Sequence, residues 1–337
     1  MSEQKTGAAP MKPSKPAAKA ENAGTTNKVS GSVVKCEVNL NKGEWVSPES
    51  CAVFYIDDEA TFPTIDFEIK TEEPGPYEWS WVIKWVVQAC PQKPGKKRFS
   101  ALTAKTYQAK GKHTSENKKW TADLNSQVIG GDLSVVVKAG TTTFKRKVTI
   151  LAKEPGEAKV ITELEKLTGT HAAEVSLAKR IFKQESRFRH FYSDEAPLVS
   201  FDNGYGLGQA TKPVPSYEEV WNWKEHVKYI VKTVIVEKRG FAKDYLSKHK
   251  PYTDEHLDTE TLVYYNGARD HYYIWNSKDK KWVINDEVVC DPDESNKGWK
   301  VTGLKSADKT VEKLRESETL KPKYTGRCYA EHIKNAN

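Results

Sequence analysis

The feature that most constrains the fold of this chain is a change in the spacing of its apolar residues at Lys153-Glu154-Pro155-Gly156. Before that point, apolar and polar residues alternate, as at Ile65, Phe67 and Ile69, which is the two-residue period of β-strands. Beyond it, apolar residues recur every three or four positions, the period of amphipathic helices. The length of 337 residues also exceeds the usual size of one domain. We therefore expect two folded regions of different type, with a boundary at residues 152–153.

Residues 31–152 are predicted to form an immunoglobulin-like β-sandwich. Their short strand-like runs are separated by turn signals such as Glu73-Pro74-Gly75-Pro76, at the spacing of an antiparallel sandwich. Trp79, Trp81 and Trp85 fall on one side of such a run. We expect them to fill the core of the sandwich, and the alternative is a platform on which sugars stack.

Residues 1–30 are mainly Ala, Lys, Pro, Thr, Asn and Gly. This composition buries too little apolar surface to offset the entropy of ordering, so we expect a disordered tail or linker. It contains no apolar segment like that of a secretory signal peptide. No stretch of the chain reaches the roughly 18 to 20 apolar residues of a membrane-spanning helix, so we expect neither Sec export nor membrane insertion.

The net charge of +7 favours an anionic partner, which could be nucleic acid, an acidic membrane surface or an anionic cell-wall polymer. The chain has no zinc-finger spacing, no Walker loop and no RNP-like aromatic motif, so nucleic acid is not the expected partner. The five cysteines show no CxxC spacing, and we expect no metal and no organic cofactor. Cys290 and Cys328 are as consistent with a disulfide as with two free thiols.

One predicted helix, residues 170–186 with Thr170 as N-cap, carries the first candidate for chemistry. Its apolar stripe runs through Phe182 and ends in Glu185. A carboxyl group in a low dielectric has a raised pKa and stays protonated near neutrality, as a general acid requires. The alternative is a glutamate at a fraying helix end that pairs with a neighbouring arginine.

Three segments then follow one another as motifs: Glu185-Ser186-Arg187-Phe188, residues 204–213 with the sequence GYGLGQATKP, and Tyr264-Tyr265-Asn266-Gly267. In order and rough spacing they resemble the soluble lytic transglycosylase family of the lysozyme superfamily, whose motifs are E-S-x-F, G-x-G-L-M-Q and Y-N-A-G. The resemblance covers about residues 160–274 and extends to goose-type lysozymes. It implies that residues 153–337 form a mainly α-helical, lysozyme-like domain.

The resemblance also implies roles for individual residues. Glu185 corresponds to the catalytic acid and base of that family. The substrate-binding positions of the family correspond to Ser186, Gly206, Gln209, Tyr265 and Asn266. Glycine at the cleft floor would let a sugar approach the backbone, and the Tyr265 hydroxyl would lie near Glu185. The alternatives are a merely flexible glycine loop and a tyrosine that only fills the core.

The chain departs from the family pattern in several places. Gly208 stands where the family has Met, and the third motif reads Tyr-Asn-Gly-Ala. Residues 272–275 and 281–284 resemble the two strands of an inserted β-hairpin. Two further helices are predicted, one from a capping box at Ser216 to Gly240 and one from Asp258-Thr259 to a C-terminal cap at Gly267.

Asp202 is the candidate second carboxylate, which a hydrolytic muramidase needs and a lytic transglycosylase does not. The alternative for Asp202 is an ordinary turn residue of the loop. Goose-type lysozymes carry a further acid two residues after the motif glutamine, where this chain has Thr211. The sequence therefore favours a lytic transglycosylase that cleaves the β-1,4 bond between N-acetylmuramic acid and N-acetylglucosamine. A muramidase of goose-type or phage-endolysin kind and a non-catalytic wall-binding module are the alternatives.

The arrangement of a polar head, a β-rich region and a wall-degrading region resembles that of antibacterial effectors delivered by type VI secretion. The expected partners are peptidoglycan glycan strands, an immunity protein and a secretion apparatus. The expected site of action is the periplasm or cell wall of a target bacterium.

Overall fold

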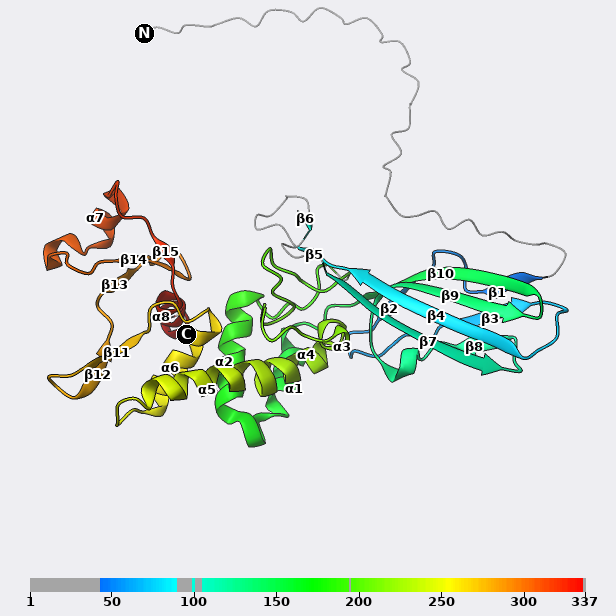
Figure 1. Ribbon diagram of the computed structural model, residues 1–337, viewed down its shortest axis with the longest axis horizontal. Coiled ribbons are helices and arrows are strands. Elements are labelled where there is room, and N and C mark those ends of the chain that lie inside the picture. Colours follow the sequence, from blue (N-terminus) through cyan, green and yellow to red (C-terminus); the bar gives the residue numbers. More distant parts are fainter. Residues whose placement is uncertain (1–42, 90–98, 101–104, 194, 336–337) are drawn as a thin grey trace, which may run out of the picture. The chain divides into compact units, whose positions relative to one another are not determined.

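The structure, a computed structural model, describes residues 43–89, 99–100, 105–193 and 195–335 (Figure 1). Strands occupy the described chain up to Ala152, and the first helix begins at Glu157, so the change in apolar period coincides with the change in secondary structure. The fold is of the α+β class, as predicted. The predicted tail at residues 1–30 and the first residues of the predicted sandwich lie outside the described residues.

Two sheets make up most of the β-rich region (Figure 1). The smaller one has the order β1 (Glu44–Ser47), β3 (Asp66–Lys70), β8 (Lys119–Thr121). The larger one has the order β2 (Val53–Ile56), β10 (Thr142–Ala152), β9 (Gly131–Ala139), β4 (Tyr77–Val86), β7 (Thr106–Ser115). Neighbouring strands run antiparallel except β2 and β10, which are parallel. A short pair, β5 (Gln88–Ala89) and β6 (Phe99–Ser100), and a 3-10 turn at Leu124–Ser126 complete the region.

Aromatic side chains from both sheets meet between them. The ring centroid of Trp79 on β4 lies 6.1 Å from that of Trp120 on β8 and 6.2 Å from that of Trp45 on β1. Trp79, Trp81 and Trp85 are only 1%, 3% and 8% exposed. The prediction that they fill the core is confirmed, and the alternative of a sugar platform is wrong because their faces are covered by protein.

The second region contains α1 (Glu157–Glu165), α2 (Thr168–Glu185), α3 (Tyr217–Trp221), α4 (Trp223–Tyr229), a π-helical segment (Ile230–Ile235), α5 (Val236–Leu246), α6 (Asp254–Tyr265), α7 (Val311–Glu316) and α8 (Gly326–Asn335). It also contains β11 (Tyr273–Asn276) and β12 (Lys281–Ile284), a small sheet of β13 (Val288–Cys290), β14 (Lys297–Lys300) and β15 (Lys323–Tyr324), and a 3-10 turn at Ser306–Asp308. The antiparallel β11–β12 pair is the predicted hairpin. Within the described ranges, no helix has the length and apolar character needed to cross a membrane.

Two predicted helix ends are confirmed. Ser216 caps α3 through its side chain, and Glu219 completes the capping box from the third helical position. Gly267 directly follows the end of α6 with φ of +91°, a left-handed conformation that favours glycine.

Three other predicted ends are wrong. Thr170 is not an N-cap, because α2 begins at Thr168 and instead kinks at His171. Gly240 does not stop its helix, because tertiary packing outweighs the cost of about 1 kcal/mol of an interior glycine and α5 continues to Leu246. The helix expected from Asp258-Thr259 begins one turn earlier, at a capping box formed by Thr253 and His256.

The strands and helices share one apolar core. Trp85 on β4 meets Trp221 on α3 edge to face, with ring centroids 5.4 Å apart. The Tyr217 hydroxyl donates a 2.6 Å hydrogen bond to the Gly130 carbonyl. A Cβ on Gly130 would lie 2.2 Å from the Trp221 ring, so glycine is required for this contact. The separation into domains at residues 152–153 stays a prediction.

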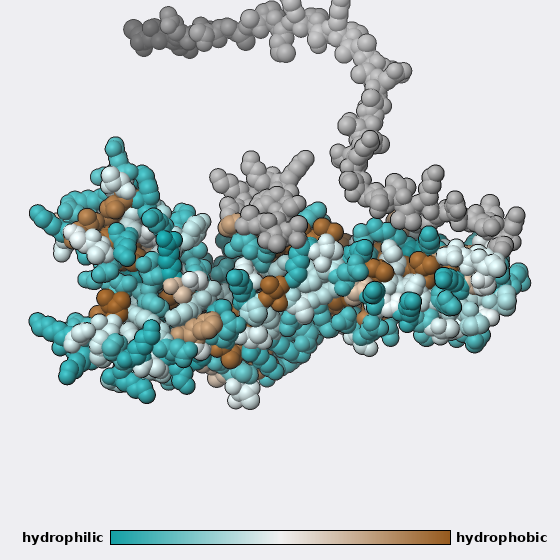
Figure 2. All heavy atoms as spheres, in the orientation of Figure 1, coloured by the Kyte–Doolittle hydropathy of each residue, from teal (hydrophilic) through white to brown (hydrophobic). Residues whose placement is uncertain are grey.

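The surface of the described part is mainly polar on the face that Figure 2 shows, where hydrophobic residues form small patches separated by hydrophilic ones. Isolated apolar side chains of this kind are usual on folded proteins. Val86 at the end of β4 is an example and is 63% exposed.

We predict that Trp79→Ala lowers the free energy of unfolding by about 3–5 kcal/mol, because it removes a large buried ring from between the two sheets. Val86→Ala on the same strand serves as the matched control and should change stability by less than about 0.5 kcal/mol. Urea denaturation of both variants measures the difference. Similar losses in the two variants would contradict the packing described here.

Candidate active site

Glu185 is the last residue of α2, and the backbone turns sharply after it. Ser186 is buried, and Arg187 and Phe188 both have left-handed backbone conformations, with φ of +54° and +59°. The Phe182 carbonyl accepts hydrogen bonds from the Ser186 amide and hydroxyl, each at 3.2 Å, and from the Phe188 amide at 3.1 Å. The Ser186 hydroxyl therefore helps to end the helix. Residues other than glycine rarely adopt the left-handed conformation, and those that do are often found at functional sites.

The environment of the Glu185 carboxyl raises its pKa from 4.5 to about 7. Burial is the largest cause, because it disfavours the charged form. The Tyr329 hydroxyl acts in the opposite direction, and the negative charge of Asp202 adds to the increase. A carboxyl group with this pKa is protonated in a large share of molecules at neutral pH, which is the state a general acid needs.

Two tyrosines close the site around this carboxyl. Tyr265 at the end of α6 and Tyr329 on α8 have nearly parallel rings, with an angle of 10° between the ring planes and centroids 6.5 Å apart. Burial and the charge of Glu185 raise the pKa of both hydroxyls well above the ordinary value, so both remain protonated. The Tyr329 hydroxyl interacts with the Glu185 carboxyl, although its geometry falls short of a standard hydrogen bond.

The glycines of residues 204–208 are required by packing within the protein. A Cβ on Gly204 would lie 2.3 Å from the Gln209 carbonyl oxygen. A Cβ on Gly206, whose φ is +57°, would lie 2.5 Å from the buried His190 ring. A Cβ on Gly208 would lie 2.7 Å from the Tyr265 hydroxyl, which donates a 2.5 Å hydrogen bond to the Gly208 carbonyl. The space beside each α-carbon is thus filled by protein, while close approach of a sugar at Gly206 stays a prediction.

The remaining sequence-predicted residues lie around this centre. The Gln209 side chain donates a 2.6 Å hydrogen bond to the Gly206 carbonyl, so it braces its own loop. Asn266 directly follows α6 as its C-cap and is partly buried. Asp202 is exposed and accepts a 2.5 Å hydrogen bond from the Ser200 hydroxyl. The influence of Asp202 on the pKa of Glu185 places these two carboxylates within electrostatic reach of each other.

The structure thus joins the three motifs at Glu185, Gly208 and Tyr265, and it adds Tyr329, which sequence reasoning missed. The signal for Tyr329 was weak, because a single tyrosine in a short amphipathic segment usually serves packing. Only the fold brings the last helix against the end of α2.

No group of three or more His, Cys, Asp or Glu side chains is arranged to hold a metal ion in the part of the chain that the structure describes.

We predict opposite changes in the pKa of Glu185 for two substitutions. Tyr329→Phe removes the interaction that lowers this pKa and should raise it above 7, whereas Asp202→Asn removes a nearby negative charge and should lower it. Titration of the Glu185 side-chain carboxyl by ¹³C NMR measures both shifts without assuming any activity. Shifts in the same direction would contradict the electrostatic description.

We also predict that Glu185→Gln stabilises the fold at high pH. Below about pH 4.5 the carboxyl is protonated in both the folded and the unfolded chain. Between 4.5 and about 7 it ionises freely only when unfolded, so the wild type loses stability as pH rises. At about 1.4 kcal/mol for each pKa unit, the variant should gain on the order of 3 kcal/mol at pH 8 and almost nothing at pH 4. Urea denaturation at the two pH values tests this, and an equal gain at both would contradict it.

Comparison with known proteins adds no relative. No protein-family model, no curated protein and no solved structure matches this chain. The resemblance to lytic transglycosylases therefore rests on the three motifs. The arrangement of Glu185, Tyr265 and Tyr329 is a separate observation.

Proposed function

We propose that this protein is a peptidoglycan lytic transglycosylase, with an immunoglobulin-like β-region before a lysozyme-like catalytic region. The observation that carries the proposal is the Glu185 carboxyl, with its pKa raised to about 7 and two protonated tyrosines around it. Its position at the end of α2, beside the loop of residues 204–210 and the end of α6, supports the correspondence with the family motifs.

In the proposed reaction, protonated Glu185 donates its proton to the glycosidic oxygen between N-acetylmuramic acid and N-acetylglucosamine as that bond breaks. The resulting carboxylate then accepts the proton of the muramyl C6 hydroxyl, whose oxygen attacks C1. The product carries a 1,6-anhydromuramyl end, and Glu185 regains its proton. The interaction with the Tyr329 hydroxyl favours the carboxylate, which is the form needed between the two steps.

A hydrolytic muramidase is the second candidate, and one observation favours it. The charge of Asp202 acts on Glu185, so a second carboxylate is available near the acid to activate water. Against it, Thr211 occupies the position two residues after Gln209 where goose-type lysozymes carry an acid. The single-carboxylate reaction therefore remains the main proposal.

The wider setting follows from the same proposal. The polar composition of residues 1–30 and the net charge of +7 suit a protein that acts on a negatively charged cell wall. We propose an antibacterial effector that acts in the periplasm or cell wall of a target cell, delivered by a type VI secretion apparatus and neutralised by an immunity protein. A phage-type endolysin would use the same catalytic site.

Mass spectrometry of muropeptides released from purified sacculi tests the reaction. The wild-type protein should release products with 1,6-anhydromuramyl ends, one water lighter than reducing ends. Glu185→Gln should reduce release by about 100- to 10,000-fold, the usual contribution of a general acid. Glu157→Gln, at an exposed position on α1, is the matched control and should retain activity.

Reducing muramyl ends would replace the proposal with a muramidase in which Asp202 takes part. Release by Glu185→Gln at the wild-type rate would overturn the assignment of the acid. Binding to sacculi without release by the wild-type protein would favour a non-catalytic wall-binding module.

A further inference from the structure

A disulfide lies next to one of the two tyrosines that close the candidate site. Cys328 on α8 is bonded to Cys290 on β13, with Cα atoms 5.3 Å apart. Cys328 directly precedes Tyr329, and both residues are 1% exposed. The bond therefore restrains the backbone of α8 next to Tyr329, whose hydroxyl interacts with the Glu185 carboxyl.

The neighbouring residues are arranged to accommodate this bond. Gly298 pairs with Cys290 across the β13–β14 ladder. A Cβ on Gly298 would lie 2.6 Å from Cys328 Sγ, so only glycine leaves room for the sulfur atom. The Arg327 guanidinium lies 2.7 Å from Cys290 Sγ, and it would stabilise a thiolate there if the disulfide opened.

The other attachments of α8, a helix of ten residues, are all noncovalent, and they include a 2.8 Å hydrogen bond from Arg327 Nε to the Asn285 carbonyl and a 2.8 Å ion pair of Lys334 with Glu255. At its start, the Gly326 amide and the Thr325 hydroxyl both bond to the Arg269 carbonyl, at 2.8 and 2.9 Å. Tyr329 and two further side chains of α8 pack into the main core beside α6. A helix this short is marginal without tertiary constraints.

The segment that the disulfide ties to α8 has only a small core of its own. Trp299, Val301 and Leu314 form a buried cluster separate from the main core. The Cys290–Cys328 bond is therefore a covalent link between this satellite segment and the helix that carries Tyr329.

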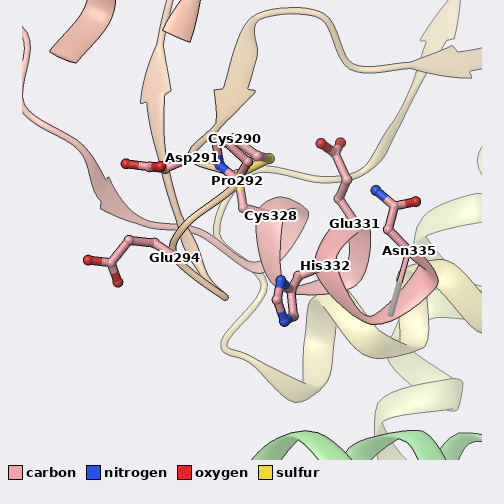
Figure 3. Close-up of a pocket in the computed structure, with 8 residues that line it drawn as sticks. All are labelled: Cys290, Asp291, Pro292, Glu294, Cys328, Glu331, His332 and Asn335. Carbon is pink, nitrogen blue, oxygen red and sulfur yellow. A yellow bond between two sulfur atoms is a disulfide. The ribbon is translucent and has the colours of Figure 1, made fainter. Parts of the chain in front are cut away.

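The disulfide also borders an open cavity of about 320 Å³ (Figure 3). The cavity is lined by both cysteines together with Asp291, Pro292, Glu294, Glu331, His332 and Asn335. Cys290 is partly exposed, so a small thiol can reach its sulfur through this opening.

We propose that the Cys290–Cys328 disulfide is a positioning element that holds Tyr329 against Glu185, so that the protein is active when oxidised and weakly active when reduced. This inference rests on the proposed function for its activity readout. It would keep the protein idle in a reducing cytosol and active in an oxidising periplasm.

The proposed switch is an ordinary thiol–disulfide exchange with a small thiol or protein dithiol as reductant. A thiolate of the reductant attacks Cys290 Sγ, forms a mixed disulfide and expels Cys328 as a thiolate that then takes up a proton. A second reductant thiol releases Cys290. Two electrons and two protons reach the cysteines, and the reductant leaves as its own disulfide.

The test compares oxidised and reduced protein on purified sacculi. A chain in which Cys36, Cys51 and Cys90 are replaced by Ser is the control, because it keeps only the pair in question. Reduction should lower its rate of muropeptide release at least tenfold, and the same loss is expected for the wild type. The double variant Cys290→Ser/Cys328→Ser should be slow in both conditions and insensitive to reductant.

Two further readouts separate positioning of Tyr329 from a general loss of structure. Reduction should let water reach Glu185 and so move the alkaline limb of the pH–rate profile to lower pH, because the loss of burial has a larger effect on the pKa than the simultaneous loss of the Tyr329 interaction, which acts in the opposite direction. Amide hydrogen exchange should accelerate in α8 while α2 and β4 stay protected.

Equal rates in the oxidised and reduced forms would overturn the inference. Exchange that accelerates throughout the chain would also overturn it, because the disulfide would then stabilise the whole fold. If no form of the protein acts on sacculi, the proposed function fails, and hydrogen exchange of α8 together with the pKa of Glu185 decides the positioning role. Unchanged values of both on reduction would reject it.

Discussion

The cost of removing the Glu185 carboxyl from water governs the rest of this site. Burial raises its pKa to about 7, and the negative end of the α2 dipole is a further unfavourable neighbour for a carboxylate. Such a group persists only where the surrounding structure holds it in place. The left-handed turn at Arg187 and Phe188, and the three hydrogen bonds on the Phe182 carbonyl, supply that restraint.

The glycine loop contributes to the same restraint in an indirect way. Gly208 leaves the space that the Tyr265 hydroxyl occupies, and its carbonyl accepts the hydrogen bond from that hydroxyl. A methionine at this position, as in the family pattern, would require a different arrangement of Tyr265. Gly208 and the position of Tyr265 therefore depend on each other, because the loop and the end of α6 fit together at this point.

Features that depend on neighbouring residues could be predicted from the sequence, whereas contacts between distant residues could not. The capping box at Ser216 and the left-handed glycine at position 267 depend on a few neighbouring residues, so the sequence alone indicates them. The prediction that a helix ends at Gly240 was wrong because α5 is stabilised by packing that the local sequence does not indicate. Tyr329 escaped notice because its contact with Glu185 joins distant parts of the chain, and a tyrosine in a short helix has no pattern that sets it apart.

Tyr329 lies far along the chain from the three motifs, and this separation bears on how the proposed reaction could be controlled. The three motifs lie within residues 160–274, whereas α8 lies beyond the segment that resembles the transglycosylase family. The acid and its closing tyrosine therefore come from parts of the chain that can change independently. In the proposed arrangement, a change at Cys328 would leave every motif intact and still alter the pKa of Glu185 through the position of Tyr329. Under the proposed function, control of this site would act on the environment of Glu185, because the motif residues must remain fixed for the proposed reaction.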